Sequence, residues 1–369
     1  MSNFRVKAYL LLALAVLAVV LIAGCSNSNA AATKSQNVAK SVPKTSSGIP
    51  KDEPVAQVAA QLGPSVVQVD VKGVQQTQMG PQQEQGIGSG VIYRKDGYII
   101  TNNHVVQGAS NVRILFADGK TMKGQVVGTD SYTDIAVVKV YRNNLPAAKF
   151  SSGSLLVGQL AVAIGSPSGF QSTVTAGVIS GLNRELGAQL GGAGPQTPSL
   201  TNLIQTDAPI SPGNSGGALA GRSGQVVGIN VAYLPQTQGG QPVEGIGFAI
   251  PAATATSVAD QIIANGKAVH PFLGIRDFRD VTPQLAQQFN VQAKSGVIVQ
   301  VAQGAPLAQA GAKTGDVITA IGSNKIKDSG DLISDLRNYK PGDTVKVKIM
   351  RGGSEKTLDV KLGTLPQQG

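Results

Sequence analysis

The amino-acid sequence lacks tryptophan, contains one cysteine and two histidines, and has only 14% charged residues over its 369 positions. The single cysteine, Cys25, cannot form an internal disulfide, and no cluster of cysteines exists that would bind zinc. The apolar run near the start, Ala8–Ala23, is shorter than the roughly 20 residues that a transmembrane helix needs. The length exceeds what one hydrophobic core usually holds, so two or more domains are expected.

Acidic residues are absent from the first 51 positions, which hold six Lys or Arg. Residues 52–266 hold 11 basic and 12 acidic residues, and residues 267–369 hold 14 basic and nine acidic ones. An enzyme acting on nucleic acid would concentrate positive charge around its active site. The balanced central segment therefore predicts no nucleic-acid partner, and the N-terminal lysines lie either near anionic lipid or in a solvated tether.

The first residues have the layout of a secretory signal, in which Arg5 and Lys7 precede the apolar run. Ile22-Ala23-Gly24-Cys25 resembles a bacterial lipobox, in which the cysteine is lipidated and becomes the mature N-terminus. An uncleaved signal anchor is the alternative, and both interpretations put the rest of the chain outside the cytoplasm. We predict a signal peptide over 1–24, a flexible tether over 25–53, and membrane anchoring through Cys25 in the cell envelope.

The 46 glycines separate short runs rich in Val and Ile, which favours strands and turns. The ranges expected as strands are Val66–Val71, Gly90–Tyr93, Tyr98–Thr101, Val112–Phe116, Lys123–Thr129, Ile135–Val140, Leu160–Ile164, Ser172–Ile179, Leu203–Gln205, Gln225–Val231 and Gly245–Ile250. Short strands at this spacing suggest barrels or sandwiches. Three stretches rich in Gly, Gln and Pro are expected as mobile loops: Gln75–Gly86, Gly187–Ser199 and Leu234–Val243.

Helical spacing occurs at Glu53–Leu62 and at Ala252–Asn265, and the second stretch ends at Gly266, a good C-terminal cap. A different module follows this second helix. In it, the strand-like runs Gly296–Val301 and Val345–Ile349 flank a helical stretch, Ser329–Asn338.

The chemistry is concentrated in Gly213-Asn214-Ser215-Gly216-Gly217. Glycines on both sides remove Cβ bulk, so the hydroxyl of Ser215 is free to meet a substrate while backbone N–H groups converge on one point. Such donors can hold the oxyanion of an acyl-transfer intermediate. A glycine-rich turn with a solvated serine is the alternative.

A serine nucleophile needs a base, and the candidates are His104 and His270. His104 follows the expected strand Tyr98–Thr101 directly. A carboxylate must orient the imidazole, and Asp134, which opens an apolar strand, suits that role, with Asp130 as a rival.

Two other enzyme classes share parts of these motifs. In α/β-hydrolases the order is Ser, Asp or Glu, His, and a helix follows the serine. Here Ser215 precedes the β-rich Gln225–Val231, and the downstream histidine lies beyond the second helix, so that fold is excluded. Gly86-Ile87-Gly88-Ser89-Gly90 lacks the third glycine spacing of a dinucleotide fingerprint and opens a strand instead of a helix.

Three motifs together resemble the catalytic motifs of the HtrA (Deg) family of trypsin-like serine proteases with C-terminal PDZ domains. They are Thr101-Asn102-Asn103-His104-Val105, Thr133-Asp134-Ile135-Ala136-Val137, and Gln205-Thr206-Asp207-Ala208 followed by Gly213-Asn214-Ser215-Gly216-Gly217. The resemblance implies that Ser215 is the nucleophile, His104 the general base and Asp134 its orienter. It implies that the backbone N–H groups of Gly213 and Ser215 form the oxyanion hole.

The implied fold is mainly β: a trypsin-like double β-barrel over 54–251, a linker helix over 252–269, and a PDZ-like α+β domain over 270–365. The resemblance suggests a substrate pocket for small or medium apolar side chains, because none of its matched residues is charged. These residues are Pro209, Ile210, Ile229, Asn230 and Val231.

In the C-terminal module, Pro271-Phe272-Leu273-Gly274-Ile275 resembles the carboxylate-binding loop of PDZ domains. A peptide is expected to add as a strand beside Leu273–Asp277, with its C-terminal carboxylate on the N–H groups of Phe272, Leu273, Gly274 and Ile275. Leu332 and Leu336 either line that groove or pack the core.

The segment Ile179-Ser180-Gly181-Leu182-Asn183-Arg184 resembles the family segment that leads into its sensor loop, where an arginine reports PDZ-peptide occupancy or contacts with a neighbouring subunit. Arg184 is matched to that arginine, and a surface arginine paired with Glu185 is the alternative. The family forms trimers through bulky apolar or aromatic N-terminal residues, and a homotrimer is expected here even though Val55–Val67 contains no aromatic residue. The implied activity is hydrolysis of unfolded or damaged envelope proteins, with no metal and no organic cofactor. The alternative is a PDZ-bearing holdase or scaffold whose protease domain is idle.

Overall fold

The structure is a computed structural model, and it describes residues 49–50, 52–77, 80–166, 172–186, 200–232, 245–288 and 291–366. The predicted signal peptide and Cys25 lie outside these residues, as do most of the tether and the two loops Gly187–Ser199 and Leu234–Val243. Within the described ranges, no helix has the length and apolar character required to cross a membrane.

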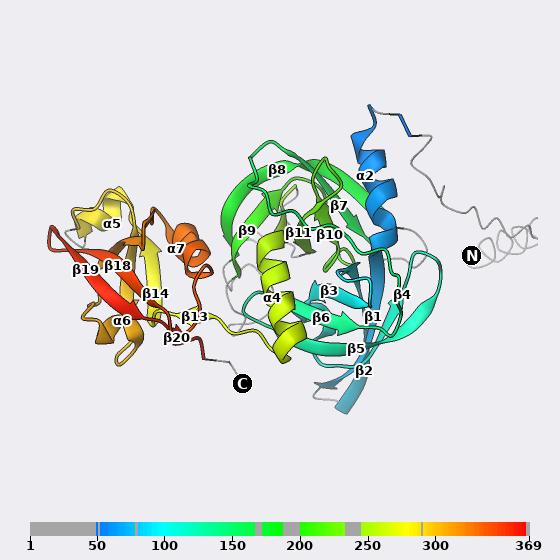
Figure 1. The fold of residues 1–369 in the computed structure, drawn as a ribbon, viewed down its shortest axis with the longest axis horizontal. Helices are drawn as coiled ribbons and strands as arrows, with labels where there is room; N and C mark the ends of the chain where they lie inside the picture. Colours follow the sequence, from blue (N-terminus) through cyan, green and yellow to red (C-terminus); the bar gives the residue numbers. More distant parts are fainter. Residues whose placement is uncertain are drawn as a thin grey trace, which may run out of the picture. The chain divides into compact units, whose positions relative to one another are not determined.

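The N-terminal part of the described chain is a closed six-stranded barrel with the order β1-β2-β3-β6-β5-β4 (Figure 1). Its strands are β1 (Val66–Thr77), β2 (Gly80–Ile92), β3 (Tyr98–Asn102), β4 (Ala109–Leu115), β5 (Thr121–Asp130) and β6 (Ile135–Lys139). Helix α2 (Pro54–Leu62) and the 3-10 turn η2 (Gly63–Ser65) precede them. The loop expected over Gln75–Gly86 is instead the paired end of β1 and β2, in register from Gly73 opposite Glu84 to Thr77 opposite Gly80. Backbone pairing does not depend on the apolar alternation that these residues lack, which is why the sequence pattern missed this hairpin.

The second barrel is also closed and has the order β10-β11-β12-β9-β8-β7. Its strands are β7 (Leu160–Gly165), β8 (Thr173–Leu186), β9 (Leu200–Thr206), β10 (Ala218–Ala220), β11 (Val226–Val231) and β12 (Gly247–Pro251). The short β10 was not expected, because three buried residues are too few to show a period. The mainly β, trypsin-like double barrel predicted from the motifs is thus confirmed.

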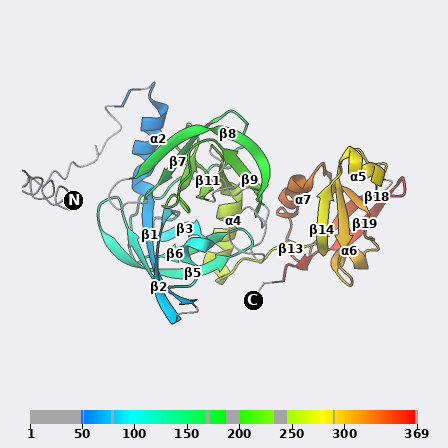
Figure 2. The ribbon, with the colours of Figure 1, turned by 180° about the vertical axis from the view of Figure 1, so that it is seen from behind.

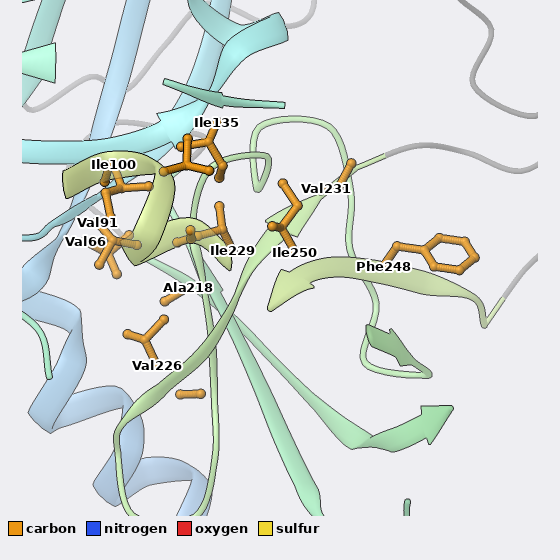
Figure 3. Packing of buried hydrophobic residues seen from close by; sticks show 14 of the residues in the cluster. Val66, Val91, Ile100, Ile135, Ala218, Val226, Ile229, Val231, Phe248 and Ile250 are labelled. Atoms are coloured by element: carbon orange, nitrogen blue, oxygen red, sulfur yellow. The ribbon is translucent and has the colours of Figure 1, made fainter. Parts of the chain in front are cut away.

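Alternate residues of the strands point to two different cores. Ile99 and Val138 lie in the interior cluster of the first barrel, whereas their neighbours Ile100 and Val137 belong to a larger cluster shared by the two barrels. Figure 3 shows this shared core, where Ile100 and Ile135 meet Ile229 of the second barrel. Because both faces of these strands are buried, they read as continuous apolar runs in the sequence.

Helix α4 (Ala252–Asn265) packs against β5 and β6 of the first barrel and β11 and β12 of the second (Figure 1, Figure 2). Its buried face includes Ala255, Val258 and Ile262. It ends at Gly266, whose left-handed φ of 74° is the C-terminal cap that the sequence predicted. The helix therefore packs across both barrels and fixes them against each other.

The C-terminal module is a β-rich PDZ-like unit with its own core around Leu273, Ile318 and Leu332. Its sheet has the order β14-β15-β16-β18-β19, with β17 pairing to β16. Its elements are β13 (Pro271–Phe272), β14 (Ile275–Asp280), α5 (Pro283–Gln288), β15 (Val297–Val301), α6 (Pro306–Gln309), β16 (Val317–Ile321), β17 (Asn324–Lys325), α7 (Ser329–Leu336), β18 (Thr344–Arg351), β19 (Ser354–Lys361) and β20 (Gly363–Thr364). Strand β14 forms one edge of this sheet, so its outer side is available for a further strand.

Candidate active site

His104 and Asp134 are brought together by neighbouring strands of the first barrel. His104 lies on the one-turn helix α3 (Asn103–Val106) that follows β3, and Asp134 lies at the turn between β5 and β6. The His104 Nδ1 atom is 2.7 Å from Asp134 Oδ2, and the His104 backbone N–H donates to Asp134 Oδ1 at 2.9 Å. His104 is therefore held at two points, by its ring and by its backbone, and the carboxylate acceptor selects the tautomer with the proton on Nδ1.

Asp134 has an unusual backbone, with a φ of 56° in the left-handed region. That conformation costs roughly 1–2 kcal/mol for a residue other than glycine. It is held by two hydrogen bonds to the Asp134 carbonyl, from Asn102 Nδ2 at 3.0 Å and from the Asn103 N–H at 3.1 Å. Asn102 is fully buried, and sequence reasoning gave it no role beyond its place in the motif.

Ser215 belongs to the second barrel, in the segment before β10, and only 6% of it is exposed. Its Oγ accepts a hydrogen bond from the Ala232 N–H at 3.0 Å. Gly213 and Gly216 on either side have left-handed φ values of 94° and 81°. These angles explain why glycine flanks the serine, because other residues adopt them at a cost.

The glycines of this segment also allow neighbouring segments of the chain to approach closely. A Cβ at Gly216 would lie 2.2 Å from the carbonyl oxygen of Ser89 on β2, and one at Gly217 would lie 2.3 Å from that of Ile164 on β7. The facing Gly165 is equally confined, since its Cβ would lie 2.2 Å from Asn214 Oδ1. Of these contacts, the one at Gly216 lies between the two barrels, and those at Gly217 and Gly165 lie within the second barrel.

The rival carboxylate, Asp130, is paired with the other histidine. Its Oδ2 lies 2.9 Å from His270 Nε2 and also accepts a hydrogen bond from Thr133 Oγ1. Burial alone would raise the pKa of Asp130, but the hydrogen bond and charge of His270, together with the bonds from Thr133, lower it on balance. The structure therefore pairs His104 with Asp134, and the rival Asp130 with His270.

The carboxylate-binding loop expected in the C-terminal module lies between β13 and β14. Leu273 is buried in the core, and the Leu273 carbonyl accepts a hydrogen bond from the Leu307 N–H at 2.8 Å. Gly274 has a φ of 86°, and a Cβ there would lie 2.2 Å from the Ala305 side chain. Leu332 is 2% exposed within the same core, so core packing accounts for its side chain.

Comparison with known proteins agrees with this geometry. Residues 88–229 match a family model described as a trypsin-like peptidase domain, and residues 271–362 match a PDZ domain. The serine protease Do-like HtrA of Lactococcus lactis is 42% identical over 288 residues, which are 74% of this chain and 70% of that protein. The chain belongs to the HtrA family of serine proteases. As a member, it is a serine endopeptidase of trypsin-like fold.

Other HtrA relatives extend the comparison. A Pseudomonas fulva protein named "Probable periplasmic serine endoprotease DegP-like" is 41% identical over 78% of this chain, which spans 58% of that protein's length. The solved structure of the HtrA-type protease AlgW with a tripeptide superposes with a TM-score of 0.68 at 34% identity, covering 85% of this chain and 98% of AlgW. The Yersinia pestis serine endoprotease gives a TM-score of 0.58 at 30% identity, with 85% and 98% covered.

The residues expected to form the substrate pocket of this HtrA protein divide between two places. Ile229 and Val231 lie fully buried in the core shared by the barrels, whereas Ile210 lies in the interior cluster of the second barrel. Pro209 is exposed, and the buried Asn230 donates from Nδ2 to the Ala218 carbonyl at 3.0 Å. Of these five residues, only Pro209 is exposed, and it lies six positions before Ser215 along the chain.

Arg184, matched to the sensor arginine of the HtrA family, is exposed on β8. Its guanidinium covers Gly181, with Nε 2.7 Å from where a Cβ would lie. Its neighbour Asn183 contacts Gly330 of α7, where an added Cβ would lie 2.7 Å from the Asn183 Cβ. The segment that carries Arg184 therefore touches the helix that borders the expected peptide groove.

Proposed function

We propose that this HtrA protein hydrolyses unfolded or damaged envelope proteins without ATP, using Ser215, His104 and Asp134. The observation that supports this most is the double attachment of His104 to Asp134, through Nδ1 at 2.7 Å and the backbone N–H at 2.9 Å. With the proton on Nδ1, Nε2 carries the lone pair that acts as the base.

In the proposed mechanism, His104 Nε2 takes the proton of Ser215 Oγ as that oxygen attacks the scissile carbonyl carbon. The charged imidazole is stabilised by the Asp134 carboxylate, and the oxyanion is held by the backbone N–H groups of Gly213 and Ser215. His104 then protonates the leaving amine, and water hydrolyses the acyl-enzyme by the same steps in reverse order. No step requires a metal or an organic cofactor.

The test is Ser215→Ala, measured by casein cleavage and by labelling with a fluorophosphonate probe. We expect labelling of the wild type only, and a loss of cleavage by several orders of magnitude in the variant. Residual cleavage within about tenfold of wild type would reject the assignment. A folded wild-type protein that does not label would instead support the holdase or scaffold alternative.

We further propose that the C-terminal end of a peptide binds beside β14, with its carboxylate on the N–H groups of Phe272, Leu273, Gly274 and Ile275. The free edge of β14 supports strand addition, and the Ser329 N–H of α7 donates to Asp280 at the end of β14 at 2.7 Å. Peptides with an apolar C-terminus should bind with at least tenfold higher affinity than their amidated forms. Equal Kd values by calorimetry would contradict the carboxylate site.

Arg184 is proposed to report that occupancy to the active site, supported by the contact between its neighbour Asn183 and α7. Arg184→Ala should remove most of the stimulation by such a peptide while sparing basal hydrolysis of a chromogenic substrate. Arg222, an exposed arginine at another turn of the same barrel, provides the control as Arg222→Ala. Equal losses of basal and stimulated rates would reject the sensor role.

The envelope location, the lipid on Cys25 and the homotrimer belong to the same proposal. The periplasmic name of the Pseudomonas relative supports the location. Leu156 and Val157 are 65% and 63% exposed, which supports an apolar contact between copies. Mass spectrometry of the mature N-terminus should find acyl chains, and Leu156→Glu should lower the mass measured by light scattering. An unmodified N-terminus refutes the lipid, and a wild-type monomer refutes the trimer.

A further inference from the structure

Ser89, on β2 of the first barrel, is fully buried and contacts the nucleophile segment of the second barrel. Its Oγ donates a hydrogen bond to the Gly213 carbonyl at 2.6 Å, across 124 residues of sequence. Its backbone N–H donates to the Ser215 carbonyl at 2.7 Å. One residue of the first barrel is thus bonded to both residues whose N–H groups form the proposed oxyanion hole.

The direction of the Ser89 hydroxyl proton is fixed by a third contact. The Ser166 N–H, at the end of β7, donates to Ser89 Oγ at 2.8 Å. Since that bond uses Oγ as an acceptor, the Oγ–H is free to point at the Gly213 carbonyl. The Ser89 carbonyl in turn accepts from Thr101 Oγ1 at 2.7 Å, which holds the residue in place.

Gly213 needs a hydrogen bond of this kind because glycine does not fix its own backbone conformation. Glycine populates positive and negative φ about equally, so its own backbone does not select the observed φ of 94°. The orientation of the Gly213 N–H depends on this angle. The Gly213 carbonyl belongs to the peptide plane that follows the Gly213 Cα, and the N–H belongs to the plane that precedes it. A hydrogen bond that fixes the carbonyl therefore anchors the Cα and limits the ψ and φ rotations through which the N–H could turn away.

We propose that Ser89 is a positioning residue for the oxyanion hole: its hydroxyl holds Gly213 in the conformation that presents the N–H to the substrate. The proposal rests on the proposed function, because it needs Ser215 to form a tetrahedral intermediate. The Ser89 hydroxyl bonds to the Gly213 carbonyl and to the Ser166 N–H, so its effect on the oxyanion hole is exerted through Gly213.

The test variant is Ser89→Ala, which keeps the backbone bond to Ser215 and removes only the hydroxyl. We expect kcat on a peptide anilide to fall about 10- to 100-fold, somewhat less than the effect of deleting an oxyanion donor, with KM within about twofold. The Ki of a peptide boronate, which mimics the tetrahedral intermediate, should rise by the factor by which kcat/KM falls. The apparent pKa of the acid limb of kcat/KM should stay the same, because His104 and Asp134 are untouched.

Thr206→Val is the matched control. Thr206 is also fully buried and uses its hydroxyl in the same way, donating to the Val178 carbonyl at 2.7 Å and accepting from the Ala208 N–H at 3.1 Å. Thr206→Val should lower the Tm to a similar extent, but the ratio of the boronate Ki to KM should stay as in the wild type. Should Ser89→Ala fail to fold, Ser89→Cys keeps a weak donor and should show a smaller loss in the same direction.

Wild-type kcat and boronate Ki in Ser89→Ala, or losses that match those of Thr206→Val, would overturn the proposal. A wild-type protein that neither labels nor cleaves would overturn the proposed function and this inference with it. The two failures are distinguished by the wild-type labelling alone.

Discussion

Gly88, on β2, faces the residue that follows the proposed base. Its backbone φ is not in the left-handed region, so alanine is allowed conformationally, but an added Cβ would lie 2.6 Å and 2.9 Å from the two Cγ atoms of Val105. These distances fall 0.8 Å and 0.5 Å short of the 3.4 Å at which ordinary contact begins. Val105 is β-branched and stiff at χ1 within α3, so it relieves the clash by moving with its backbone.

We expect Gly88→Ala to reduce the free energy of unfolding by about 1–2 kcal/mol. Overpacking of this kind costs about 1–3 kcal/mol, and the smaller entropy of the unfolded alanine chain offsets roughly 0.4–1 kcal/mol. The shift of Val105 displaces His104 from Ser215. Since a misplacement of 1 Å can cost about 100-fold in rate, a loss of kcat/KM of about tenfold is expected.

The reasoning is checked by a double-mutant cycle with Val105→Ala, which removes the two methyl groups that the new Cβ would meet. In that background, Gly88→Ala should leave kcat/KM within about threefold of the value for Val105→Ala alone. In urea unfolding, the two substitutions should show a coupling free energy of about 1 kcal/mol or more. Gly63→Ala is the control, because no atom lies within 4 Å of a Cβ there. Additive effects in the cycle would refute the steric explanation.

Two further predictions concern buried carboxylates. His270 helps to hold the pKa of Asp130 below its unfolded value of about 3.9. The stabilisation that results is present above the unfolded pKa and is lost as the pH falls through the folded pKa. His270→Ala should therefore move the acid-side decrease in Tm to higher pH. A constant Tm difference between pH 3 and 7 would contradict this. Arg351→Met should cost about 3–5 kcal/mol in urea unfolding, because Asp316 is 1% exposed and is held by Arg351 through two bonds of 2.6 Å. The exposed pair of Lys346 with Asp359 gives the control Lys346→Met, expected within about 0.5 kcal/mol of wild type, and equal losses in the two variants would be inconsistent with the argument.

The fold was predictable where a local pattern reports a local structure. Helix α4 has the predicted bounds, because its apolar spacing and Gly266 both lie within the helix itself. The sequence also places Asp134 directly before β6, which is where the structure puts it opposite His104. Such features need only the period of a strand or helix and its end signals.

Contacts across the barrels were not predictable in this way. The sequence shows the segment Gly86-Ile87-Gly88-Ser89-Gly90 only as a glycine-rich run that does not match a dinucleotide-binding motif. Nothing in it indicates that Ser89 bonds to the carbonyl of Gly213, 124 residues away. The left-handed φ of Asp134 was equally hidden, because aspartate only tolerates this conformation and the bond from Asn102 that holds it comes from another strand. Among the pocket residues, Pro209 was chosen by its distance from Ser215 along the chain and Ile229–Val231 as the facing strand, and neither criterion tells which core a side chain enters.

The close approach of the two barrels at Gly216 has a consequence for how related sequences are compared. A homologue that keeps the serine, histidine and aspartate of this site but carries a side chain at the position of Gly216 would have to move its two barrels apart, because a Cβ there lies 2.2 Å from the carbonyl oxygen of Ser89. A side chain at the position of Gly165 or Gly217 would instead displace segments within the second barrel, since each Cβ lies 2.2–2.3 Å from an atom of that barrel. Inactive paralogues are therefore better sought at these three glycines as well as at the catalytic side chains.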